Sequence, residues 1–134
     1  NGNSKLVLED LKWESKEWGY ENQGYPIFVR LTAKFESPTF TGHYRFSITE
    51  NNLNKFVEDL QEGHSRLKQS AELSNFEDDV KIKVSPILTG QITVKGHIQD
   101  SAHLNKLNFE FETDQTYLPD FISELENEMK HLKN

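Results

Sequence analysis

The sequence contains no cysteine, which excludes disulfide bonds and thiolate metal sites. It has no apolar run near the ~20 residues that a membrane-spanning helix requires, and no signal-peptide pattern is visible. These absences fit a soluble protein in a reducing compartment. We therefore expect a cytoplasmic location and no contact with a membrane.

Motifs for catalysis and for cofactor binding are absent as well. The five histidines form no HxH, HExxH or HxxxH pair, so no local metal-ligand spacing exists. The glycines match neither GxGxxG nor GxxxxGK, and no serine lies in a GxSxG motif. Glu110 and Glu112 alternate with phenylalanines, which places them on the solvent face of a strand rather than opposite each other in a cleft. We predict no catalytic residue, no metal site, no cofactor and no enzyme activity.

The composition favours a thin aromatic core beneath a charged surface. Only 34% of the 134 residues are hydrophobic and 28% are charged, but there are nine Phe, four Tyr and two Trp, and disordered chains are poor in aromatic residues. This length is most economically one domain, residues 1–134. The net charge of −7 would repel nucleic acid and attract a basic protein.

Alternation of apolar and polar residues predicts strands along most of the chain. The pattern is most regular over 27–35 and 40–48, where the inward phase begins with Ile27 and Phe40, and ESPT (36–39) between them predicts a hairpin turn. The turn LTGQ (88–91) predicts another hairpin. The other predicted strands are 6–8, 67–73, 80–84, 92–98 and 107–111.

Two segments have helical periodicity instead. In the first, apolar residues recur from Leu53 to Leu60; Thr49 or Asn51 can cap its first turn, and Gly63 is expected to end it. The second runs from about 117–119 to the C-terminus, because Pro119 is tolerated only in a first turn. Just before it, Asp114 and Thr116 are expected to satisfy free N–H groups at the helix start.

An antiparallel sheet with one apolar face needs a cover, and the two amphipathic helices are the available cover. We predict an α+β fold: a single, mainly antiparallel sheet of six or seven strands with two amphipathic helices packed on one face. A shift of 65 residues aligns the two helices and the strands before them. This could be a duplication, but any two amphipathic helices that follow strands align comparably, and we favour that simpler interpretation. The aligned pairs are Phe46 with Phe111, Leu53 with Leu118, Phe56 with Phe121, Val57 with Ile122, and Leu60 with Leu125.

Two surfaces are candidates for binding. The outward strand positions include several lysines and arginines, but the strand aromatics take the inward phase, so the base-stacking platform of a single-strand-binding sheet is missing. Nucleic-acid binding is therefore disfavoured. The loop 13–26 is a better candidate, because Trp and Tyr are enriched at interface hot spots and carboxylates suit a basic partner; the alternative is that its rings cap the core. The predicted contacts are Trp18, Tyr20, Tyr25, Glu14, Glu17 and Glu21.

The segments FTGHYRFSI, GQITVKGHI and FEFETDQTYLPDFISEL, with a helix between the first two, resemble small bacterial proteins of the WapI-like immunity class. The resemblance spans about residues 25–130, and its distinctive motif is DQTYL (114–118), a turn from a strand into the last helix. It implies a non-enzymatic inhibitor that binds a cognate secreted toxin, often a nuclease, inside the producing cell. It carries over no functional residues.

Two other functions stay open. One is a small-ligand-binding or enzymatic domain of unknown reaction, whose pocket could hold His43, His97 and Arg45. The other is a folded accessory domain of a larger secreted protein.

Overall fold

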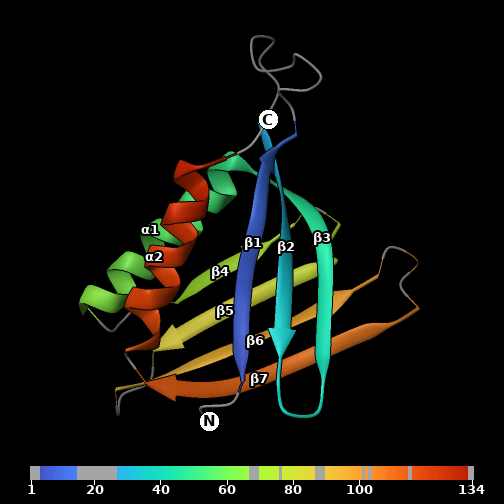
Figure 1. Ribbon diagram of the computed structural model, residues 1–134. Helices are drawn as coiled ribbons and strands as arrows, with labels where there is room; N and C mark the ends of the chain where they lie inside the picture. Colours follow the sequence, from blue (N-terminus) through green and yellow to red (C-terminus); the bar gives the residue numbers. More distant parts are fainter. Residues whose placement is uncertain are drawn as a thin grey trace.

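The computed structural model describes residues 4–14, 27–66, 70–75, 77–86, 90–100, 102, 104–114 and 116–132, with the backbone alone for 63–66. Two groups of antiparallel strands are each followed by a helix (Figure 1). In chain order the elements are β1 (Lys5–Trp13), β2 (Phe28–Glu36), β3 (Thr41–Thr49), α1 (Glu50–Arg66), β4 (Ala71–Ser74), β5 (Val80–Pro86), β6 (Gln91–Gln99), β7 (Lys106–Asp114) and α2 (Tyr117–Lys130).

The α+β class and the antiparallel pairing are confirmed, but the prediction of a single sheet is wrong. The strands form two separate sheets, in the orders β1-β2-β3 and β4-β5-β6-β7. The helix α1 separates β3 from β4 in the chain. Alternation assigns each strand an apolar face, but it does not say whether strands on either side of a helix pair with one another.

The two sheets face each other across one hydrophobic core. The three-stranded sheet lies in front of the four-stranded sheet, and their strands cross at a steep angle (Figure 1), as in orthogonal sheet packing. Phe35 of β2 stacks on Phe109 of β7, with ring centroids 4.7 Å apart. Each sheet therefore covers much of the other's apolar face, a task that the sequence analysis assigned to the helices alone.

The helices complete the core along one side of the two sheets (Figure 1). Helix α1 packs on β4 and α2 packs on β1, and the two helices also contact each other. Neither described helix is long and apolar enough to cross a membrane. The buried helix residues are those of the predicted apolar stripes: Leu53, Phe56, Val57, Leu60, Leu118, Phe121, Ile122 and Leu125.

The predicted hairpin at 36–39 is confirmed, but one residue of its second strand lies elsewhere. Phe40 is 65% exposed rather than inward, because it belongs to the turn. Its carbonyl accepts a hydrogen bond from the Ser37 N–H at 2.8 Å, and its N–H donates to the Ser37 hydroxyl at 3.0 Å. The strand therefore begins at Thr41. Residues 67–69 and 87–89, which belong to a predicted strand and the second predicted turn, lie outside the described residues.

The helix starts agree with prediction better than the helix ends. The Thr49 hydroxyl accepts the Asn52 N–H at 3.2 Å and caps α1, whereas the predicted stop at Gly63 is wrong because α1 continues to Arg66. Helix α2 begins at Tyr117, within the predicted range. It ends at Lys130, shortly before the chain end.

The junction before α2 uses Asp114 rather than Thr116. The Asp114 carboxylate accepts both the backbone N–H and the hydroxyl of Thr116, and these bonds hold the pKa of Asp114 below its usual value. Thr116 occupies the N-cap position with helical backbone angles and makes no side-chain capping bond. Its predicted capping role is therefore wrong: its hydroxyl donates back to Asp114 instead of accepting from the helix.

The two strand–helix units are related by an approximate twofold arrangement. Strands β3 and β7 are offset by 65 residues at both ends, and residues separated by this offset contact each other at three places. A residue meets its own equivalent only near a twofold axis, so the geometry favours a duplication over the simpler interpretation that the sequence suggested. The pairs in contact are Gly42 with Leu107, Phe56 with Phe121, and Gln61 with Glu126.

Candidate functional site

Only one of the six predicted contact residues lies within the described part of the chain. Glu14 follows directly after β1. The other five lie outside the described residues: Trp18, Tyr20, Tyr25, Glu17 and Glu21.

The Glu14 carboxylate is already engaged within the protein. It forms an ion pair with Arg30 on β2, and its side chain is only 14% exposed. Burial alone would raise the pKa of Glu14, but the hydrogen bond from Ser47 and the ion pair with Arg30 outweigh burial and lower it. Its charge is therefore largely neutralised before any partner arrives.

A small hollow lies beside Glu14 on the outer face of the three-stranded sheet. Its volume is about 130 Å³. Three of its five lining side chains are cationic, so the hollow itself carries a net positive charge; the rest of the predicted acidic loop lies outside the described residues. The lining residues are Lys12, Trp13, Glu14, Arg30 and Arg45.

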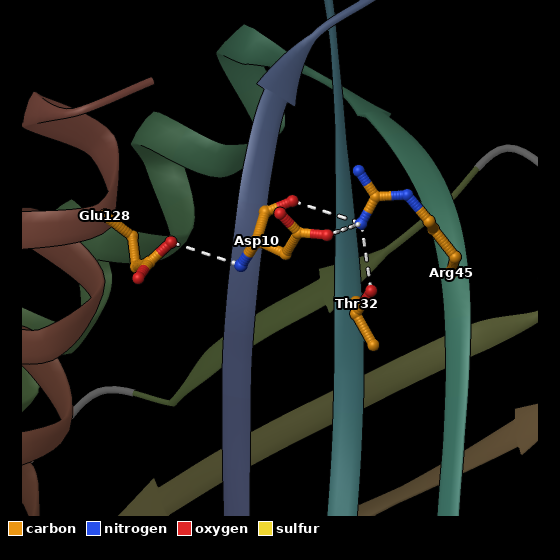
Figure 2. Close-up of polar contacts among 4 residues, drawn as sticks. All are labelled: Asp10, Thr32, Arg45 and Glu128. Carbon is orange, nitrogen blue, oxygen red and sulfur yellow. Dashed lines mark hydrogen bonds and ion pairs between the residues drawn. The ribbon is translucent and has the colours of Figure 1, made fainter. Parts of the chain in front are cut away.

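Arg45 also ties β3 to an irregularity in β1 (Figure 2). The pairing of β1 with β2 shifts between Glu9 and Lys12, and Asp10 within this bulge has a positive φ of 57°, which Asp tolerates better than most residues. One guanidinium nitrogen of Arg45 donates to the Asp10 carbonyl at 3.1 Å and to its carboxylate at 3.2 Å. The same nitrogen donates to the Thr32 hydroxyl at 2.9 Å. These contacts give Arg45 a structural role.

The polar groups proposed for a ligand pocket are not brought together. Arg45 and His43 lie on β3, and His43 pairs with Lys34 on the outer face of the first sheet. His97 lies on the outer face of the second sheet, where its Nε2 is 3.1 Å from the Asp78 carbonyl oxygen. The prediction that these residues share a pocket is therefore wrong. Within the described residues, no group of three His, Asp or Glu side chains could hold a metal ion.

The charge of the protein is unevenly distributed between its layers. By sequence, the seven strands contain seven acids and nine bases, whereas the two helices contain eight acids and three bases. The net negative charge is therefore concentrated on the helices and in the loops, and the sheets are close to neutral. The helical pair is the acidic face of the described fold.

A shallow groove of about 520 Å³ runs between α1 and α2. Val57 and Met129 give it an apolar floor, and Glu58 and Glu126 stand at its rim. Gln61 bridges the two helices by donating a hydrogen bond to Glu126 at 2.7 Å. The full lining is Asn54, Val57, Glu58, Gln61, Glu126, Met129 and Lys130.

The groove could not be located from the sequence alone, although two features of the sequence are consistent with it. The 65-residue shift aligns Gln61 with Glu126. In addition, the polar faces of both predicted helices, opposite their apolar stripes, are rich in Glu and Asp. The sequence does not show that the two helices contact each other. Only that contact joins their two acidic faces into one surface.

Comparison with known proteins gives both a fold relative and a family. A solved structure of the plant transcriptional regulator PBF-2 is similar in fold, with a TM-score of 0.52 and 14% sequence identity over 98% of this chain and 78% of that chain. At this identity the similarity concerns the fold alone. No curated protein sequence matches the chain. The model of the WapI-like immunity protein family matches residues 2–133, nearly the whole chain. The chain therefore belongs to the WapI-like family of immunity proteins.

Proposed function

We propose that this protein binds a cognate bacterial toxin in the cytoplasm of the producing cell and neutralises it by occupying the toxin's surface, without catalysis. Family membership supports an immunity role with a protein partner. The concentration of acidic residues on the two helices supports a basic partner, because complementary charge accelerates association and excludes wrong partners.

A nuclease is the toxin class that best fits this charge. A nuclease must hold a polyanionic backbone, and proteins do so with lysine and arginine side chains. An acidic protein that docks on such a surface competes directly with the nucleic acid. Inhibition then needs no reactive group on the immunity protein, which agrees with the lack of a recognisable catalytic motif in its sequence.

The test uses the product of the reading frame directly upstream of this chain's gene. Cells that express that product alone should stop growing, and co-expression of this protein should restore growth. The two purified proteins should form a complex whose association rate falls at least about tenfold between ~50 mM and ~500 mM salt. An upstream product that is harmless in cells lacking this protein would contradict the proposal.

Two results would favour the other functions. Turnover or saturable binding of a small metabolite by the purified protein would favour a ligand-binding or enzymatic domain. Continuation of the full-length gene into a larger secreted protein would favour an accessory domain.

A further inference from the structure

We infer that the groove between α1 and α2 is the docking site for a basic segment of the partner protein, one that inserts a lysine or arginine side chain. This inference rests on the proposed function and names the surface that carries it. It names the helical pair as the partner surface, in place of the loop residues that the sequence favours.

The shape of the groove suits a long cationic side chain. Val57 and Met129 form an apolar floor, against which the aliphatic stem of Lys or Arg can pack while its charged end stays at the polar rim. Glu58 and Glu126 stand on opposite helices at that rim. The lining thus holds two carboxylates against the single ammonium group of Lys130, and this net negative charge favours a basic group.

The rim carboxylates are available for such a group. None of the ion pairs between described side chains involves Glu58 or Glu126. Glu126 accepts a hydrogen bond from Gln61 through one oxygen, which fixes the carboxylate and leaves its second oxygen for the partner. This contrasts with Glu14, whose charge is already paired with Arg30.

The groove is also held in shape by the core beneath it. Phe56 and Phe121 pack edge to face under the helical pair, with ring centroids 6.4 Å apart, and both side chains are buried. A preformed surface loses little conformational entropy on binding, so more of its contact energy appears as affinity.

The test compares matched pairs of variants for binding to the upstream product at ~150 mM salt. At this ionic strength the screening length is about 8 Å, so a distant charge has little effect. The double variant Glu58→Lys/Glu126→Lys should weaken binding about 100-fold, since it opposes a basic side chain directly. Its control, Glu72→Lys/Glu110→Lys, makes the same change in net charge on the outer face of the four-stranded sheet and should change the dissociation constant less than about threefold.

A second pair keeps the charge constant and keeps the inference testable if the double reversal does not fold. Asn54→Trp places an indole at the groove and should also weaken binding about 100-fold, because buried interface centres carry most of the affinity. Asn108→Trp makes the same exchange at an exposed position on the outer face of β7 and should leave binding unchanged. Circular dichroism establishes that each variant is folded.

The outcomes separate this inference from the proposed function. If the wild-type protein neither binds the upstream product nor restores growth, both fall together. If the wild type binds and protects but folded groove variants bind equally well, the inference alone is overturned. Loss of binding in the groove variants with unchanged controls supports both.

Discussion

The two strand–helix units protect their outer sheet edges in different ways. In the C-terminal unit, β4 pairs with β5 and extends the sheet by one strand. In the N-terminal unit, no described strand pairs with the outer side of β1. There α2 supplies side chains instead: the Tyr117 hydroxyl donates to the Leu6 carbonyl at 3.2 Å, and Glu128 accepts the Asp10 N–H at 3.1 Å.

This difference makes the N-terminal sheet dependent on the C-terminal helix. An unpaired strand edge invites pairing with other chains, and proteins blunt it with bulges, charges or a covering helix. Strand β1 has both a bulge at Asp10 and the cover of α2. We therefore expect the two units to unfold together. Changes at the seam between them, where α1 packs against α2 over Phe56 and Phe121, should affect both.

The largest effect is expected for the aromatic pair at the seam. Phe56→Ala and Phe121→Ala should each lower the free energy of unfolding by about 3–5 kcal/mol, the usual cost of a large cavity in a core. Because the rings contact each other, the double variant should cost less than the sum of the two single variants. Denaturant unfolding measures all three. Strict additivity would show that the two units do not share this part of the core.

A slightly smaller loss of stability is expected when alanine replaces either of two glycines on the inner faces of the sheets, and the loss should differ between them. A Cβ at Gly96 would overlap the backbone carbonyl oxygen of Lys81, whereas a Cβ at Gly42 would meet only the end of the Leu107 side chain. Gly96→Ala should therefore cost about 3 kcal/mol, and Gly42→Ala about 1 kcal/mol, because a side chain can move and a strand backbone cannot. Thermal and denaturant unfolding of both variants provide the test. Equal costs would contradict the difference between the backbone contact at Gly96 and the side-chain contact at Gly42.

The third prediction concerns pH and the cover of β1. Burial raises the pKa of Tyr117 to about 12, against about 10 in an unfolded chain. Below pH 10 both states keep the phenol proton and the stabilisation is complete. Between pH 10 and 12 only the unfolded chain loses it, so the free energy of unfolding should fall by up to about 1.4 kcal/mol per pH unit.

The variant Tyr117→Phe isolates this contribution. It should lower stability at pH 7 by about 0.5–1.5 kcal/mol through loss of the hydrogen bond to Leu6, and its stability should decline less steeply between pH 10 and 12. An identical pH dependence in the two proteins would mean that the phenol is not buried against β1.

The smallest effect is expected at the other contact of α2 with β1. Glu128→Ala removes the acceptor of the Asp10 N–H and should cost about 0.5–1 kcal/mol, because the bond is exposed to solvent. Glu124→Ala, at an exposed position of the same helix, should stay within about 0.5 kcal/mol of the wild type. Hydrogen exchange of the Asp10 amide should accelerate in the first variant alone. Unchanged exchange would show that the helix does not protect the bulge.

Local features of the fold were predictable from the sequence, but the assembly of its parts was not. Alternation identified the inward faces of both sheets, and Pro119 located the start of α2, because both signals depend on neighbouring residues. The division into two sheets depends on which strands pair across α1, and no local pattern specifies that. The Asp114–Thr116 junction shows a related limit: the residue types suit a helix cap, but backbone angles decide which group accepts the hydrogen bond.

The candidate site, like the fold, depends on how distant parts of the chain assemble, which the sequence does not specify. Sequence reasoning selected the loop 14–26 for its aromatic residues, and within the described chain its Glu14 is paired internally with Arg30. Glu58 and Glu126 are far apart in the chain and unremarkable as sequence. They form one surface only because the twofold arrangement places α1 against α2.

Hydrogen–deuterium exchange, measured with and without the bound upstream product, tests most directly the claim that the seam between the two units is the partner surface. We expect slower exchange on binding in α1 around residues 54–61 and in α2 around residues 126–130, with little change on the outer faces of either sheet. Protection confined to residues 14–26 or to the outer sheet faces would contradict this claim.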